Sequence, residues 1–582
     1  MRYPTIPPRK VTLQAVEVFR GYNRSLKIKP GEFREMENLT SDCYPVLSPR
    51  GKRGVYRKPA SPQGLIAKEA LCYVDGADFF IGDVKIPMGL SVDPADCPKK
   101  LISMGAYVLI LPDKMYINTA SPEDFGSMEA RVTVSGVQAT LCGGDGGPLT
   151  WVTQAPEEPE NGALWMDGER LKQYSSAQSA WIPVTDTRVK LAAPGIGTGF
   201  FPGDGVTVQG CAPLNGNRVI LEVQEDDITL AGLISGNFTQ EEPLTVKREM
   251  PDMDYVTQAE NRLWGCRYGA GPDGKPVNEI YASKLGDFRN WNCFQGLSTD
   301  SYRASCGSDG PFTGAVTHLG YPLFFREGCV HKVYGSEPAS FRIQTTACRG
   351  VQAGCSRSLA VVGETLMYKS PAGVCSYDGS LPVEVSQALG TERYFGAAAG
   401  AIGDKYYISM ADSAGEYSLF VYDRGKGLWH REDGLSCSDF CAWGGELFAI
   451  DRASRNILGL LGSGEPEEQV RWMAETGELG MDASRRPRSV WNAKPVRSTV
   501  PAQLLRFLEK LDDPKQVVTI LRSYIVSPER VMHTVAACGD YNQAILELNT
   551  IPYRNPDNQQ DIPVCRTDLS QYDRLLGRRD AV

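Results

Sequence analysis

A repeated pattern of short strands and tight turns constrains the fold of this chain more than any other feature. Its clearest copy is the stretch 395–433, in which residues 405–410 and 417–423 alternate apolar and polar side chains. Alternation of this kind indicates half-buried β-strands. Turn-forming residues join the two strands, and a second turn leads to Trp429. Such a unit cannot bury its own apolar face, so it must pack against further copies of itself.

Looser copies of the unit recur along the chain and predict an all-β fold. They begin near Leu65, Leu101, Met253, Gly314, Ser358 and Cys437. Their spacing of roughly 35–55 residues is typical of propeller blades, and the copies together predict a propeller of about seven blades. A β-sandwich or an irregular β array is the alternative, which the repeat period disfavours.

Changes in composition divide the chain into five parts. The repeat pattern is interrupted by Gly-rich turns and an acidic, Pro-rich loop at 157–160, and it resumes at Met253. Near the C-terminus a basic stretch, 484–488, precedes leucines at helical spacing. We therefore expect an N-terminal arm (1–58), the first propeller blades (59–128), an inserted small β domain (129–250), the remaining blades (251–482), and a linker with a short helical segment (483–582).

The N-terminal arm is rich in large apolar residues whose spacing fits neither a long helix nor a regular pair of strands. We expect it to lie on a pre-formed surface, either of its own propeller or of a neighbouring subunit, with a short helical turn at 35–39. Arg50 and Arg53 are expected to pair with acidic residues on that surface. The candidate interface residues are Phe19, Tyr22, Phe33, Met36, Leu39, Tyr44, Arg50 and Arg53.

Composition and charge narrow the functional classes. A net charge of −9 over 582 residues gives no reason to expect a nucleic-acid-binding protein. The N-terminus has no apolar stretch typical of a signal peptide, and no apolar run approaches the length of a membrane span. The 16 cysteines are spread along the chain without a CxxC pair. Buried free thiols are the favoured interpretation, and a secreted disulfide scaffold is the lesser alternative.

The sequence contains no convincing catalytic or metal-binding set. Its four histidines, His318, His331, His430 and His533, occupy unrelated positions, and no GxSxG motif occurs. Residues 423–429 approximate the turn S-x-D-x-G-x-x-W of sialidase-type propellers, but Val421 stands where that turn has its serine. We predict no catalytic residues, no metal, no cofactor and no enzymatic activity.

Two passages resemble phage proteins. Gly21-Tyr22-Asn23, together with residues 30–42 and 44–50, resembles the start of virion structural proteins of tailed phages and prophages of Gram-positive gut bacteria. Residues 261–265, followed by 280–283 and 286–291, are similar to phage β-propeller proteins of the head-to-tail and tail region. Packaged-DNA stabilisation (tail hub) proteins are the best-known relatives in pattern.

The resemblance implies a virion structural protein that assembles as a ring or hub through its propeller and arm. Its implied partners are other virion proteins and further copies of itself, with passive contact with packaged DNA and assembly in the cytoplasm of the bacterial host. The alternative is a tail-tip propeller that binds or cleaves glycans. A host scaffold of the WD or kelch type is disfavoured because the Gly-His and Trp-Asp repeats are missing. The position in the virion, the copy number, the role of the inserted domain and the origin of residues 483–582 stay open.

Overall fold

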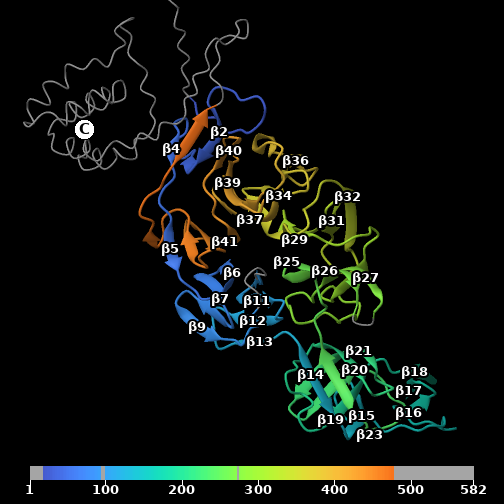
Figure 1. The fold of residues 1–582 in the computed structure, drawn as a ribbon. Helices are drawn as coiled ribbons and strands as arrows, with labels where there is room; N and C mark the ends of the chain where they lie inside the picture. The colour runs from blue at the N-terminus through green and yellow to red at the C-terminus, as the bar shows by residue number, and fades with distance from the viewer. Residues whose placement is uncertain (1–17, 93–98, 272–273, 477–582) are drawn as a thin grey trace, which may run out of the picture. The chain divides into compact units, whose positions relative to one another are not determined.

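The computed structural model describes residues 18–92, 99–271 and 274–476 (Figure 1). Every secondary-structure element assigned in these residues is a β-strand, except for two short 3-10 helices, η1(Ser356–Ser358) and η2(Gln387–Leu389). The predicted all-β fold class is therefore confirmed. The predicted helical segment after residue 483 lies outside the described residues.

Seven antiparallel sheets of four or five strands make up most of the described chain. The first and second contain β6(Pro62–Ala67), β7(Leu71–Asp75), β8(Asp78–Ile81) and β9(Val84–Pro87), then β10(Lys100–Met104), β11(Tyr107–Leu111), β12(Met115–Asn118) and β13(Phe125–Ser127). The third and fourth contain β25(Tyr255–Ala259), β26(Arg262–Ala270), β27(Pro276–Ala282) and β28(Tyr302–Ser305), then β29(Gly314–His318), β30(Tyr321–Arg326), β31(Cys329–Tyr334) and β32(Arg342–Ala347). The fifth and sixth contain β33(Ala360–Val362), β34(Thr365–Lys369), β35(Val374–Tyr377) and β36(Val383–Glu384), then β37(Phe395–Ile402), β38(Lys405–Ala411), β39(Tyr417–Asp423) and β40(Leu428–Arg431). The seventh contains β41(Cys437–Trp443), β42(Glu446–Asp451), β43(Ile457–Gly459), β5(Gly54–Arg57) and β44(Glu465–Pro466).

The seven sheets close into a β-propeller. The first strand of the first sheet contacts those of the second and of the seventh sheet, and the backbone N–H of Leu65 donates to Asp439 Oδ2 at 3.0 Å. In addition, β5 pairs with β43, so a strand from near the N-terminus completes the last sheet. Residues 54–57 thus belong to the propeller rather than to the arm, because closing the ring requires a strand from each end of the repeat array.

The sixth sheet shows how the repeated unit folds. Its β38 and β39 coincide with the strands expected at 405–410 and 417–423, β38 being one residue longer. Tyr406 pairs with Tyr422, and Ile408 pairs with Phe420. Tyr406, Ile408 and Phe420 are fully buried in a core cluster that also contains Trp429. These residues therefore fill the space between this sheet and its neighbours. The prediction that the strand is half-buried is wrong for β38, because Tyr407 on its other face is buried as well, in a second core cluster with Leu447 of the seventh sheet.

Residues 130–248 form a separate β unit between the second and third sheets. An eight-stranded sheet surrounds its own apolar core and comprises β14(Ala130–Val134), β15(Val137–Gly143), β19(Thr187–Ala192), β20(Gly205–Gln209), β21(Gly216–Gln224), β22(Asp227–Ala231), β23(Phe238–Gln240) and β24(Leu244–Arg248). A three-stranded sheet accompanies it, formed by β16(Leu164–Asp167), β17(Arg170–Ser175) and β18(Ala180–Pro183).

A buried polar cluster joins this inserted unit to the propeller. Arg248 and Asp204 form an ion pair in which both side chains are almost fully buried. Asn290, in the loop after β27, donates to Asp204 Oδ1 at 3.0 Å and accepts from the Gly205 N–H at 2.8 Å. Since each of these groups is buried and paired, the cluster fixes the geometry of the connection.

The arm forms strands rather than the expected helical turn. Its elements are β1(Gly21–Tyr22), β2(Glu32–Glu37), β3(Leu39–Thr40) and β4(Ser48–Pro49). Strand β2 pairs with β1 and with β45(Met473–Thr476) from the far end of the described chain, and it lies beside β40 (Figure 1). The prediction of a helical turn at 35–39 is wrong. Pairing with β45 satisfies the backbone hydrogen bonds of this segment in an extended conformation.

Thirteen cysteines lie in the described residues, and all of them are free thiols. Nine are buried, whereas Cys43 in the arm is exposed. Burial raises the pKa of several of these thiols, as at Cys293 and Cys306, where it reaches about 11. The predicted buried free thiols are thus observed in the described part of the chain.

Candidate functional site

The arm packs into the side of the sixth sheet of its own chain. Phe19, Tyr22, Met36 and Leu39 are buried there in the same cluster as Trp429. The ring centroids of Tyr22 and Phe420 lie 6.0 Å apart. Of the two surfaces that the sequence left open, the arm therefore lies on its own propeller.

Gly21 permits the closest approach of the arm to the sheet. Its φ angle is +88°, and a Cβ atom at this position would lie 2.4 Å from the carbonyl oxygen of Trp429. Only glycine combines this backbone conformation with such a short contact. The close packing of the arm against the sixth sheet therefore requires glycine at position 21.

An ion-pair network holds the second half of the arm. The Arg53 guanidinium donates to Glu432 Oε2 at 2.6 Å and to Asp433 Oδ2 at 2.7 Å. Arg50 donates to Glu467 Oε1 at 2.5 Å. Both arginines and Glu432 are buried, so the Arg53–Glu432 pair is shielded from solvent, whereas Asp433 and Glu467 are partly exposed. The acidic residues that were expected to pair with Arg50 and Arg53 therefore belong to the same chain.

The network changes the acidity of its carboxyl groups. Burial alone would raise the pKa of Asp433, but the charge and hydrogen bonds of Arg53 outweigh it and hold that pKa below its usual value. Glu467 shows the same balance, with Arg50 as the main partner that lowers its pKa. Both carboxyl groups are therefore charged at neutral pH and stabilise the arm.

A second polar cluster fastens β3 and the following turn. The Ser41 hydroxyl donates to Asp423 Oδ2 at 2.5 Å, and Lys405 forms an ion pair with Asp42. His430 lies nearby and is fully buried. Burial, reinforced by the charge of Lys405, lowers the pKa of His430 to about 3, so the ring is neutral in the folded protein.

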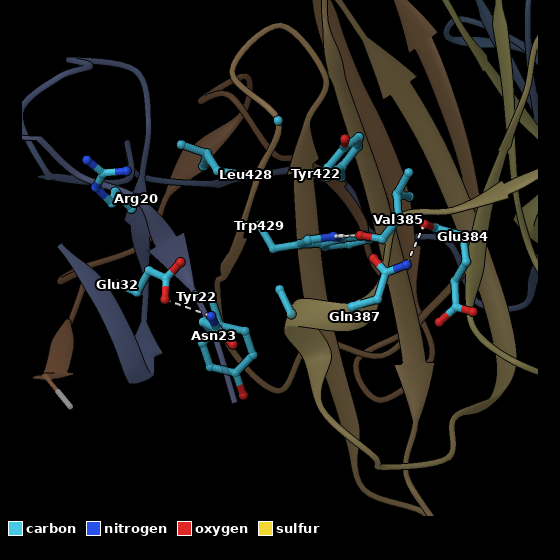
Figure 2. A pocket seen from close by; sticks show the side chains of 12 residues that line it. Arg20, Tyr22, Asn23, Glu32, Glu384, Val385, Gln387, Tyr422, Leu428 and Trp429 are labelled. Carbon is cyan, nitrogen blue, oxygen red and sulfur yellow. Dashed lines mark hydrogen bonds between the residues drawn. The ribbon is translucent and has the colours of Figure 1, made fainter. Parts of the chain in front are cut away.

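A cavity of about 310 Å³ remains where the arm meets the fifth and sixth sheets (Figure 2). The indole of Trp429 forms one wall, and its Nε1–H donates to the carbonyl of Val385 at 2.7 Å. Polar side chains, among them Asn23, Glu32 and Gln387, line the rest. The lining is thus mostly hydrogen-bonding groups around an aromatic wall.

The tip of the arm, residues 43–46, is exposed but held in place. Tyr44 and Val46 expose 44% and 48% of their surface, respectively. The carbonyl of Pro45 accepts from the Phe19 N–H at 2.9 Å, and the Val46 N–H donates to the carbonyl of Cys43 at 2.9 Å. This arm tip therefore presents apolar side chains from an ordered backbone.

The eight interface residues predicted from the sequence fall into two groups. Tyr44 is exposed and Phe33 is half-buried, whereas the other six are buried in the chain's own structure. The structure brings seven of them to the arm's contacts with the sixth and seventh sheets, and it places Tyr44 at the arm tip. Glu432, Asp433 and Glu467 were not identified from the sequence as partners of the arginines. The adjacent acidic residues Glu432 and Asp433, which follow Trp429 closely, were the one available signal.

No set of three or more His, Cys, Asp or Glu side chains within residues 18–92, 99–271 and 274–476 is arranged to hold a metal ion. Within the same ranges, no helix has the length and apolar character needed to cross a membrane.

Comparisons with known proteins return only distant matches. No protein-family model and no curated protein sequence matches the chain. Among solved structures, BamB from Moraxella catarrhalis is 9% identical over 70% of this chain and 96% of its own, with a TM-score of 0.30. The phage phi92 endosialidase is 9% identical over 79% of this chain and 75% of its own, with a TM-score of 0.23. The designed Ika8 protein is 9% identical over 70% of this chain and 99% of its own, with a TM-score of 0.31. The class of fold, a β-propeller, rests on the sheet pairing described above.

Proposed function

We propose that this chain is a non-enzymatic structural protein of a tailed-phage virion, placed in the head-to-tail or tail region. In this role it assembles with copies of itself and with other virion proteins through its propeller and its arm tip. The sequence resemblance of the arm and of residues 261–291 to such proteins supports this role.

The observation that carries the proposal is that the arm is anchored on its own propeller while its tip stays exposed. A long irregular segment is anchored by buried aromatic residues and by ion pairs, yet its tip keeps Tyr44 and Val46 in solvent. Tyrosine is among the residue types that most often dominate protein–protein interfaces, and Val46 extends the apolar surface beside Tyr44. The arm therefore serves assembly by displaying its tip, and not by leaving its own subunit.

Native mass spectrometry of the purified full-length chain tests this role. We expect a defined homo-oligomer for the wild-type protein and a monomer for the Tyr44→Ser/Val46→Ser double variant. Val84→Ser is the matched control, because Val84 is an exposed apolar residue of the first sheet. The proposed role of the arm tip in assembly is contradicted if the double variant forms the same oligomer as the Val84→Ser control.

A further inference from the structure

Two cavities meet at one side chain, Tyr422 of β39. The first is the cavity beside Trp429 described above, and the second has a volume of about 360 Å³ and lies between the fifth and sixth sheets. Tyr422 lines both of them. Its ring centroid is 5.0 Å from that of the buried Trp429, and the two rings are tilted by 39°. We call the two cavities and the Tyr422 ring that borders both of them the groove; each volume lies at the lower end of the range of small-molecule sites.

Unused hydrogen-bonding groups face this groove. Arg20 lines the first cavity and Arg424 the second, and neither guanidinium makes a hydrogen bond or ion pair with another residue in the described part of the chain. Glu32 uses one carboxylate oxygen for Asn23, at 2.7 Å, and that oxygen also accepts from the Lys29 N–H. Its other oxygen is available to a ligand.

The charges of the groove nearly balance, which favours an uncharged ligand. Glu384 is already paired with Arg349 at 2.6 Å, which leaves the carboxylates of Glu32 and Asp378 opposite the two guanidinium groups of Arg20 and Arg424. A polyanion such as DNA would meet no excess of positive charge here, so the site does not suit nucleic acid.

The edge of the fifth sheet does not suit an added peptide strand. Its outer strand β36 has only two residues. The carbonyl of Glu384 accepts from Gln387 Nε2 at 2.7 Å, and the next carbonyl, that of Val385, accepts from Trp429 Nε1 at 2.7 Å. Strand addition requires consecutive free backbone groups, and here they are occupied.

We propose that this groove binds a neutral oligosaccharide. The C–H face of one sugar ring packs on the ring of Tyr422, and sugars on either side occupy the two cavities. Hydroxyl groups both donate and accept, so they match a lining that offers the guanidinium groups of Arg20 and Arg424 as donors and the carboxylates of Glu32 and Asp378 as acceptors. The groove binds this ligand whether or not the chain is a virion component.

Isothermal titration of the full-length protein with cellotetraose, maltotetraose, mannotetraose and chitotetraose tests the proposal. We expect at least one of these to bind with one site per chain. Arg424→Ala and Tyr422→Ala should each weaken that binding, the latter by about ten-fold because an aromatic contact is lost. Tyr422→Phe should keep most of the affinity, because it retains the ring.

The matched control is Arg393→Ala, which removes an exposed arginine that does not line either cavity. It should bind like the wild-type protein. Arg424→Ala changes an exposed side chain, so it keeps the test valid if Tyr422→Ala fails to fold. The proposal is overturned if none of the four sugars binds at millimolar concentration, or if binding is unchanged in both groove variants. Binding of a random hexapeptide pool that is lost in Arg424→Ala, without binding of any sugar, would also overturn it.

Discussion

Arg53 of the arm donates from Nη2 to Glu432 Oε2 at 2.6 Å, and both side chains are almost completely buried. The two residues lie 379 positions apart in the sequence. This pair joins the segment that precedes the closing strand β5 to the segment that follows the sixth sheet. It therefore ties the arm and the ring closure into one structural unit.

Removing Arg53 should be strongly destabilising. Arg53→Ala removes the guanidinium that donates to Glu432 and Asp433 and leaves the buried Glu432 only Arg50, whose Nε lies 3.8 Å from Glu432 Oε2, so we expect a loss of about 3 kcal/mol of unfolding free energy. The control is Lys58→Ala, which breaks an exposed pair with Glu465 whose side chains are 65% and 73% accessible, respectively. That change should cost about 0–1 kcal/mol. Urea unfolding followed by tryptophan fluorescence measures both, and equal effects would contradict the assignment.

Gly21 offers a test of how the arm docks. Gly21→Ala places a Cβ against the Trp429 carbonyl at a positive φ, so we expect a loss of about 2–3 kcal/mol. Gly51→Ala, in the same arm, meets no atom within 4 Å and should be close to neutral. Thermal unfolding of the two variants distinguishes them. A Gly21→Ala protein as stable as the Gly51→Ala protein would show that β1 does not dock as described.

Two buried histidines predict sensitivity to mild acid. Burial and Arg326 lower the pKa of His331 to about 4, and burial with Lys405 lowers that of His430 to about 3. Each ring is neutral when folded and takes up a proton on unfolding below about pH 6.5. Stability that is complete above pH 6.5 is therefore lost as the pH falls toward 4, by up to about 1.4 kcal/mol per pH unit and histidine.

The double variant His331→Gln/His430→Gln isolates this effect. Urea midpoints measured between pH 7 and about 5 avoid most carboxyl titration. The slope of stability against pH in this window should be clearly smaller in the double variant than in the wild-type protein. An unchanged slope would mean that these two histidines do not carry the dependence.

Local patterns predicted the repeated sheets, whereas the arm's contacts depend on residues far apart in sequence. The alternation at 405–410 and 417–423 gave the strands of the sixth sheet because neighbouring side chains alone determine such a pattern. The pairing of β2 with β45 and of Arg53 with Glu432 joins segments more than three hundred residues apart, and no local signal encodes it. The groove at Tyr422 was likewise beyond prediction, because two sheets and the arm must come together to form it.

Electron microscopy of purified phage particles tests the proposed function most directly. The particles should come from a lysogen in which this chain carries a C-terminal label, and the Tyr44→Ser/Val46→Ser variant should be imaged beside the wild-type protein. We predict label at the neck or along the tail of wild-type particles and its loss in the variant. Particles that form normally and carry no label in the wild type would contradict a structural role in the virion.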